Sequence, residues 1–293
     1  MTTLLVRGML GLGDNIMQRW IVREIVRRHE GHVYLETPWP QLVADLPVRC
    51  VARRSKLRTQ EKNAARADLV WSGAPADAVV QRIRYTGASG SMLAAMCACV
   101  GVSPDALTYD LPTFKRQERR PYIVVRPATV REEFRATARN PQPEYLAMAV
   151  DALRNDFDIV SVADLARGRE WALPPLPFAH ETFHAGELVL EDLLALVQNA
   201  AGCIGGVGWI APACVAYRVP LFIIYGGSGE YDGPQRIFDP RMPTEKVHHA
   251  IPDNFCLCNR RDHACDKRIS GVAEQVETWA MGLDSRRSAA VVA

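Results

Sequence analysis

Short β-rich runs alternate with longer amphipathic stretches along this chain of 293 residues. In the stretch Ile16–Arg28, the side chains of Ile16, Trp20 and Ile25 share one broad apolar face, which is typical of a helix packed on a core. The run Leu221–Tyr225 is apolar throughout, as expected for a parallel strand that is covered on both faces. Strands that alternate with helices predict parallel sheets with right-handed crossovers.

The strands predicted from this pattern are Leu4–Val6, His32–Leu35, Arg49–Ala52, Asp68–Trp71, Tyr122–Val125, Asp158–Val162, Gly202–Ile204 and Pro220–Tyr225. The helices predicted are Ile16–Arg28, Met92–Val100, Glu144–Asn155, Glu191–Ala200, Trp209–Tyr217 and Ser270–Leu283.

The alternation lapses in the charged segment Phe114–Arg120, which we interpret as a linker. Because the chain is about twice the length of a typical domain, we expect one lobe on each side of it, at residues 1–118 and 119–283, followed by a frayed tail at 284–293. The predicted fold class is therefore α/β, with two Rossmann-like lobes, parallel sheets and an interlobe cleft. Open α/β sheets bind ligands at the carboxyl ends of their strands, so we expect the ligands in that cleft.

Composition bears on the expected location of the protein and on the distribution of its charge. No apolar run reaches the roughly 20 residues of a membrane helix, and the first residues lack the layout of a signal peptide, so we expect a cytoplasmic protein without stable membrane insertion. Residues 1–120 contain 18 Lys and Arg against 11 Asp and Glu, and the basic residues are densest from Arg49 to Arg66. Such a run is either a solvated surface or a surface that attracts an anionic partner.

The first candidate site is the glycine-rich segment Gly8–Asn15, between the first predicted strand and helix. Gly11 and Gly13 would let the backbone approach a ligand, and the amides at a helix start favour anions. Asp14 then lies near the ligand, although a helix-capping role in a tight turn is the alternative. A dinucleotide-binding fingerprint needs a third glycine where this chain has Ile16, which disfavours NAD.

The second candidate site is the turn Gly205–Trp209, again between a strand and a helix. Its three glycines are more than a plain turn needs, and their exposed amides would hold a diphosphate. Trp209 would stack on a base or sugar, or else pack in the core. The glycines of this site are Gly205, Gly206 and Gly208. Gly226 and Gly227, at the end of the strand that follows, are either a ligand loop or a flexible lid.

A third candidate site holds three cysteines and one histidine within ten residues. Cys256, Cys258, His263 and Cys265 supply the four soft ligands of a closed tetrahedral site, so we predict a structural zinc ion, with unpaired reduced thiols as the alternative. The other cysteines are expected to be reduced and packed in the core: Cys50, Cys97, Cys99, Cys203 and Cys214.

The order of these motifs resembles that of the bacterial ADP-heptose:lipopolysaccharide heptosyltransferases, over most of the chain and at a distance. The segments that carry the resemblance are Gly11-Leu12-Gly13-Asp14, Val125-Arg126-Pro127, Arg139-Asn140-Pro141, Gly205-Gly206-Val207-Gly208-Trp209, Ala213–Pro220 and Ile224-Tyr225-Gly226. The family's late motif has an acidic residue and a histidine where this chain has Ile204 or Gly205 and Trp209, which leaves the sugar and the acceptor open.

The resemblance implies a GT-B fold and an inverting mechanism that needs no catalytic metal or other cofactor. It also implies a nucleotide-sugar donor in the C-terminal lobe, and the basic charge of the N-terminal lobe favours an anionic acceptor there. Asp14 would be the general base that deprotonates the acceptor hydroxyl. Arg126 or Arg139 would neutralise the departing diphosphate, although each of the two could be an exposed loop charge instead.

The sequence thus predicts transfer of a sugar from a nucleotide-diphosphate sugar to an anionic acceptor. The acceptor would be a phosphorylated glycolipid or saccharide, or a hydroxymethylated base in DNA. The alternatives are a nucleotide-sugar epimerase or hydrolase, and a catalytically inactive nucleotide- or DNA-binding protein on the same fold. The oligomeric state is not predicted.

Overall fold

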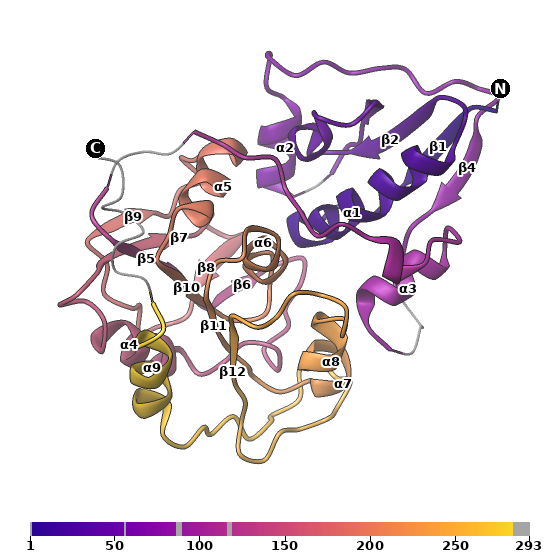
Figure 1. The fold of residues 1–293 in the computed structure, drawn as a ribbon. Helices are drawn as coiled ribbons and strands as arrows, with labels where there is room; N and C mark the ends of the chain where they lie inside the picture. The colour runs from indigo at the N-terminus through magenta and orange to yellow at the C-terminus, as the bar shows by residue number, and fades with distance from the viewer. Residues whose placement is uncertain (1, 56, 86–89, 116–118, 284–293) are drawn as a thin grey trace. The chain divides into compact units, whose positions relative to one another are not determined.

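The computed structural model describes residues 2–55, 57–85, 90–115 and 119–283 (Figure 1). The chain divides into two compact units: an N-terminal unit of residues 1–113 with Phe238–Met242, and a C-terminal unit of residues 114–237 with 243–293. The chain returns to the N-terminal unit at Phe238–Met242. In this segment the Asp239 carboxylate accepts a hydrogen bond of 2.5 Å from the Ser91 hydroxyl. Residues 116–118 of the predicted linker and the predicted tail 284–293 lie outside the described residues.

The N-terminal unit contains a four-stranded parallel sheet in the order β3-β2-β1-β4. Its strands are β1 (Leu4–Arg7), β2 (Val33–Thr37), β3 (Val48–Ala52) and β4 (Val79–Arg82). Its helices are α1 (Leu12–Arg28), α2 (Arg58–Ala64) and α3 (Met92–Ala98), with the 3-10 turns η1 (Pro40–Val43) and η2 (Pro104–Ala106).

The strand predicted at Asp68–Trp71 is wrong, because these residues are irregular and the fourth strand is β4 instead. Asp68 pairs with Arg66 across a turn at 2.6 Å, and the Val70 side chain is 84% exposed. The sequence signal for β4 is weak because Val79 and Val80 lie at the edge of the sheet and stay largely exposed. The predicted β1, β2, β3, α1 and α3 are confirmed within a few residues.

The C-terminal unit contains a six-stranded parallel sheet in the order β12-β11-β10-β5-β7-β9. Its strands are β5 (Tyr122–Arg126), β7 (Asp158–Val162), β9 (Glu181–Phe183), β10 (Gly202–Gly205), β11 (Leu221–Ile224) and β12 (Val247–Ala250). A separate antiparallel pair joins β6 (Thr129–Arg131) to β8 (Glu170–Ala172). The helices are α4 (Pro143–Asp151), α5 (Leu190–Gln198), α6 (Ile210–Tyr217), α7 (Gly229–Asp232), α8 (Pro234–Ile237) and α9 (Val272–Ala280).

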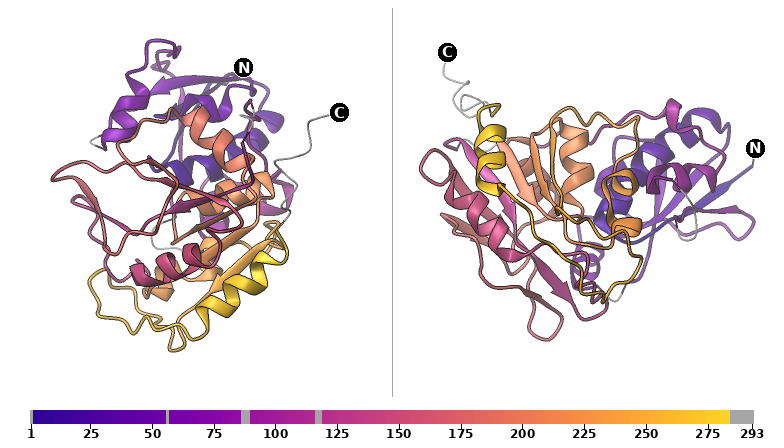
Figure 2. Two further views of the ribbon diagram at one scale, coloured as in Figure 1. Left: turned by 90° about the vertical axis from the view of Figure 1, so that its left-hand side faces the viewer. Right: turned by 90° about the horizontal axis from the view of Figure 1, so that it is seen from below.

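Helices cover both faces of this sheet, with α4 and α9 on one face and α5 and α6 on the other (Figures 1 and 2). Side chains alternate between the faces, so that Ile123, Ile204 and Phe222 pack with Leu146 of α4 and Val276 of α9 in one core. Full burial of each such side chain stabilises the fold by about 1.5–3 kcal/mol. This double cover explains why the predicted run at β11 is apolar throughout.

The order of the strands reverses once in each sheet, and this reversal marks a place for ligands. In the N-terminal unit the chain moves outward from β1 to β2 and β3, and β4 then joins the other side of β1. In the C-terminal unit, β7 and β9 follow β5 on one side and β10, β11 and β12 extend the other. Crevices form at the carboxyl ends of the two strands that flank such a reversal, which are β1 with β4 and β5 with β10.

The α/β class and the parallel sheets predicted from the sequence are confirmed. Among the cysteines expected in the core, Cys97, Cys203 and Cys214 are buried and Cys50 is half-buried, but Cys99 is exposed, so core packing is wrong for Cys99. No helix among the described residues combines the length and the apolar character that crossing a membrane requires.

Candidate functional site

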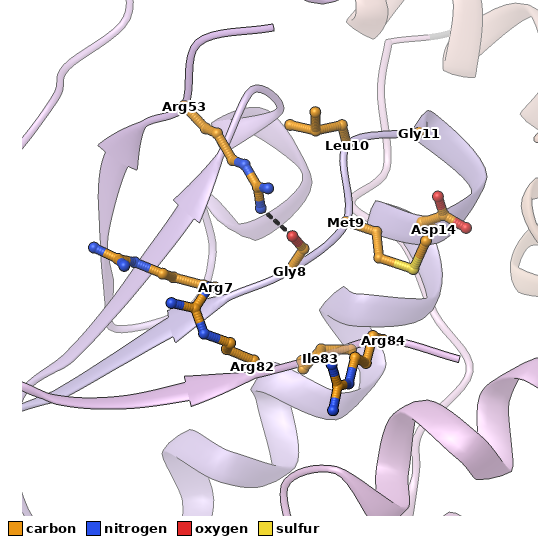
Figure 3. Close-up of a pocket in the computed structure, with 10 residues that line it drawn as sticks. All are labelled: Arg7, Gly8, Met9, Leu10, Gly11, Asp14, Arg53, Arg82, Ile83 and Arg84. Atoms are coloured by element: carbon orange, nitrogen blue, oxygen red, sulfur yellow. Dashed lines mark hydrogen bonds between the residues drawn. The ribbon is translucent and has the colours of Figure 1, made fainter. Parts of the chain in front are cut away.

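A pocket of about 520 Å³ lies at the reversal of the N-terminal sheet (Figure 3). Its wall combines the turn that follows β1, the end of β4 and a residue that follows β3. The lining residues are Arg7, Gly8, Met9, Leu10, Gly11, Asp14, Arg53, Arg82, Ile83 and Arg84.

The turn from Gly8 to Gly11 is held by side chains that donate hydrogen bonds to each of its carbonyls. Asn15 donates to the oxygens of Met9 and Gly11 at 2.9 and 2.8 Å, Trp39 donates to Leu10 at 3.0 Å, and Arg53 donates to Gly8 (Figure 3). The turn is therefore rigid before any ligand arrives. The glycines of this turn are evident in the sequence, but the role of Asn15 is not, because a polar residue in the first turn of a helix is common.

Glycine is required in this turn partly for packing. A Cβ at Gly8 would lie 1.6 Å from Oε1 of Gln18, which accepts a hydrogen bond from the Met9 amide. Gly11 is the N-cap of α1, and a Cβ there would lie 2.7 Å from a carboxylate oxygen of Asp14. Gly13 lies inside the first turn of α1 and not in the preceding loop.

Asp14 occupies the first turn of α1, half-buried and lining the pocket. The cap position itself belongs to Gly11, so the alternative in which Asp14 is the capping residue is not what the structure shows. The positive end of the helix dipole stabilises a carboxylate at this position. Asp14 is therefore an anionic group at the edge of a pocket that is otherwise basic.

Four arginines surround the pocket, and only part of their charge is balanced. Arg7 and Arg53 share Glu36, at 2.8 and 3.5 Å. Arg82 and Arg84 are exposed, and no carboxylate of the described residues pairs with either. The pocket thus holds a surplus of positive charge, which suits an anionic ligand. The sequence drew attention to the run that contains Arg53, but Arg7, Arg82 and Arg84 become neighbours only when β4 pairs with β1.

The reversal of the C-terminal sheet brings together Arg126, the last residue of β5, and the turn Gly205–Trp209 after β10. The Arg126 side chain is 15% exposed, its Nη2 lies 3.2 Å from Oγ1 of Thr129, and a Cβ at Gly208 would lie 3.3 Å from its Nη1. Burial lowers the pKa of Arg126 to about 10, and repulsion from neighbouring arginines adds to this effect. A guanidinium held in such surroundings gains stability when an anion binds beside it.

The neighbouring arginines are Arg131 and Arg139. Arg131 pairs with Glu170 at 2.8 Å, and the same carboxylate lies 4.0 Å from Arg126. Nε of Arg139 lies 3.3 Å from a carboxylate oxygen of Asp232, whose pKa is raised by burial. The structure therefore places both predicted arginines in one cluster, in which three guanidinium groups face two carboxylates.

The predicted glycines of this unit are explained by close packing. A Cβ at Gly206 would lie 3.0 Å from Cδ of Pro141, and one at Gly205 would lie 3.4 Å from Cβ of Arg126. At Gly226, a Cβ would lie 2.3–2.6 Å from the carbonyl oxygens of residues 138–140, and at Gly227 it would lie 2.1 Å from Sγ of Cys265. The last two glycines therefore belong to a tightly packed segment and not to an uncovered lid.

Trp209 is half-buried at the start of α6, so it is not a core residue. This position leaves open the stacking role predicted from the sequence.

The four predicted metal ligands lie together, with their ligand atoms all within 4.8 Å of one another. Sγ of Cys258 and Cys265 are 3.6 Å apart, and Nδ1 of His263 lies 3.5 Å from Sγ of Cys256 and 3.3 Å from Sγ of Cys265. Ligands at about 2.3 Å (sulfur) and 2.0–2.1 Å (nitrogen) from a tetrahedral centre are separated by roughly 3.5–3.8 Å. The donor set and its spacing therefore fit one tetrahedral metal ion.

No protein-family model matches this chain. No curated protein matches its sequence.

Among solved structures, the chain is similar to the dodecameric iron-containing heptosyltransferase TibC of enterotoxigenic E. coli in complex with ADP-D-β-D-heptose. The TM-score is 0.60 at 14% identity, over 96% of this chain and 77% of TibC. It is also similar to the ADP-heptose lps heptosyltransferase II of E. coli, with a TM-score of 0.51 at 13% identity over 96% and 99% of the two chains. A glycosyl transferase family 9 protein of Veillonella parvula gives a TM-score of 0.52 at 12% identity over 96% of each chain. At such identities the likeness shows a shared fold, and the fold expected from the motifs is thereby confirmed.

Replacement of Gly226 by alanine tests the packing of the segment after β11 against residues 138–140. The new Cβ would meet three backbone carbonyls that cannot rotate away, so we expect Gly226→Ala to lower the free energy of unfolding by about 1–3 kcal/mol. The matched control is Gly208→Ala, where the nearest atom is the end of the flexible Arg126 side chain and the expected change is below about 1 kcal/mol. Denaturant titration of both variants provides the measurement, and equal stability of the two would contradict this packing.

Proposed function

We propose that this protein is an inverting glycosyltransferase that moves a sugar from a nucleotide-diphosphate sugar to a phosphorylated saccharide or glycolipid. The observation that carries the proposal is the half-buried, incompletely neutralised arginine cluster at the reversal of the C-terminal sheet, in a fold shared with heptosyltransferases. The basic pocket around Asp14 in the N-terminal unit offers a site for the acceptor.

The donor is assigned to the C-terminal unit. Its diphosphate would lie at the carboxyl ends of β5 and β10, where the amides of the Gly205–Trp209 turn and the start of α6 favour negative charge. Arg126 and Arg139 would contact the phosphate oxygens, and the half-buried Trp209 would stack on the base or the sugar. The solved structures named above include one with ADP-D-β-D-heptose, which is a donor of this chemical class.

The reaction needs a base and a means to stabilise the leaving group. Asp14 would accept the proton of the acceptor hydroxyl as the hydroxyl oxygen bonds to the anomeric carbon. The bond between that carbon and the phosphate oxygen breaks on the opposite face, so the configuration inverts. The nucleoside diphosphate leaves with the electron pair, and Arg126 and Arg139 would neutralise its charge without a catalytic metal.

The acceptor is assigned to the pocket in the N-terminal unit, and the arginines there favour a phosphate group on it. Arg7, Arg53, Arg82 and Arg84 converge on one pocket of about 520 Å³, which has room for a compact group such as a saccharide phosphate. This distribution favours a phosphorylated saccharide or glycolipid over a hydroxymethylated base in DNA.

We also propose that Cys256, Cys258, His263 and Cys265 hold a structural zinc ion, because four thiolate and imidazole ligands leave no open position for chemistry. The same ligands also accept iron, the metal that TibC contains. Metal analysis of the purified protein distinguishes the two ions.

Substitution of Asp14 by asparagine tests the proposed base. We expect Asp14→Asn to lower kcat for sugar transfer roughly 10²–10⁴-fold while the dissociation constant of the donor stays the same, because the amide keeps the shape of the side chain but accepts no proton. The exposed Asp77, which lies outside the pocket in the same unit, provides the control Asp77→Asn.

Unchanged turnover in Asp14→Asn would reject Asp14 as the base. Release of sugar at the full rate with no acceptor present would reject transfer itself in favour of a nucleotide-sugar hydrolase.

Substitution of Arg82 by alanine tests the anionic acceptor. We expect Arg82→Ala to raise KM for a phosphorylated acceptor by about 10- to 100-fold, the value of one charge-assisted contact, and to leave KM for the same acceptor without its phosphate unchanged. The control is Arg54→Ala, an exposed arginine of the same unit that does not line the pocket. Preferential glycosylation of hydroxymethylated duplex DNA, with no effect of Arg82→Ala on a saccharide phosphate, would contradict the assignment.

A further inference from the structure

The four metal ligands lie in a long segment that has no helix or strand. Residues 251–270 connect β12 to α9 in turns and extended chain (Figure 1). Irregular segments of this length are uncommon inside a compact unit unless something fixes them. A metal ion bound by Cys256, Cys258, His263 and Cys265 would crosslink the middle of the segment and remove most of its freedom.

Residues 227–230, which follow β11, contact one side of this segment. The amides of Gly229 and Glu230 donate hydrogen bonds to the carbonyl oxygens of Cys256 and Cys258, at 2.8 and 3.3 Å. These are amides of the first turn of α7, and the acceptors belong to metal ligands. Gly227 packs so closely on Cys265 that any side chain at Gly227 would overlap its Sγ. The position of α7, and with it Asp232, is therefore set by the ligands themselves.

The loop of residues 137–141, which contains Arg139, contacts the same segment through Arg261 and Lys267. The Ala138 amide donates to the carbonyl oxygen of Arg261 at 2.9 Å, and Nζ of Lys267 donates to the carbonyl oxygens of Thr137 and Asn140, both at 2.6 Å. The Arg261 guanidinium also lies 4.3 Å from the ring centroid of Phe134, at the start of the same loop.

The two supported segments also contact each other. The Gly227 amide donates to the carbonyl oxygen of Ala138 at 2.6 Å, and Arg139 faces Asp232 at 3.3 Å. Arg139 is therefore held through its own loop and through its carboxylate partner, and both of these rest on the segment that the metal would crosslink.

We propose that the metal ion is the anchor that positions Arg139 for the anionic part of the ligand, so that loss of the metal weakens binding of a nucleotide-diphosphate sugar without unfolding the sheet. This inference rests on the proposed donor site. The ion contacts no substrate, and its effect passes through the loop of residues 137–141 and through α7.

Hydrogen exchange tests the anchor without reference to the ligand. The full-length protein is compared as purified, with its metal measured by mass spectrometry, and after treatment with a chelator. We expect one equivalent of metal as purified. Without it, the amides of Ala138, Gly229 and Glu230 should exchange at least about tenfold faster, while amides of β5 and β10 keep their protection. Absence of metal from the purified protein, or unchanged exchange of the three amides after its removal, would overturn the proposal.

Calorimetric titration with the nucleotide-diphosphate sugar tests the consequence for binding. Since a charge-assisted contact with phosphate would be lost, we expect the metal-free protein to bind the donor about 10- to 100-fold more weakly. Lys267→Met should also weaken donor binding but should keep the metal. It removes the hydrogen bonds from Lys267 to Thr137 and Asn140 and leaves the four metal ligands unchanged. The control is Lys246→Met, an exposed lysine of the same unit, which should change neither quantity.

The two proposals fail in different ways. If the metal-loaded protein binds no nucleotide sugar but the three amides still lose protection without metal, the donor site is wrong and the anchor stands. If the donor binds equally well with and without metal, the anchor is wrong and the donor site stands.

Discussion

The parallel direction of the strands is the constraint on which the candidate sites depend. Because every strand of a sheet ends at the same edge, residues that are far apart in the chain meet there, and the reversal of strand order leaves room between two of them. In the N-terminal unit this edge gathers Arg7, Arg53 and Arg82 around the first turn of α1. In the C-terminal unit it sets Arg126 against the glycine turn after β10. The same arrangement thus produces two cationic sites from unrelated stretches of sequence.

Both sites contain more guanidinium groups than carboxylates, but in different environments. Arg82 and Arg84 are exposed, so their attraction for an anion is screened by salt, whereas Arg126 is largely buried and its charge acts at short range in a medium of low polarity. Exposed arginines such as Arg82 and Arg84 suit capture of a charged acceptor, and a largely buried guanidinium such as Arg126 suits stabilisation of charge that develops on a leaving diphosphate. The proposed division between acceptor and donor follows from this difference.

Local patterns in the sequence predicted much of this architecture, and long-range pairing explains most of what they missed. The buried strand β11 is a continuous apolar run, the helix α1 presents a broad apolar face, and the four metal ligands lie within ten residues, so all of these were predictable. The exposed edge strand β4 has a weak signal, and its absence from the prediction also hid Arg82 and Arg84 as neighbours of Arg7. Gly226 and Gly227 suggested a ligand loop or a lid, but their lack of side chains is required by Cys265 and by the carbonyls of residues 138–140, contacts that no local pattern contains.

The central claim is that the arginine cluster of the C-terminal unit binds the diphosphate of a nucleotide sugar. The most direct measurement is the melting temperature of the wild-type protein and of Arg126→Met with UDP-, GDP-, ADP- and CMP-sugars and with the bare nucleotides, because a ligand that binds only the native state raises this temperature. The account predicts that one nucleotide-diphosphate sugar and its bare nucleoside diphosphate both stabilise the wild-type protein, and that Arg126→Met abolishes most of this shift. No shift with any of these ligands, or an equal shift in Arg126→Met, would contradict it.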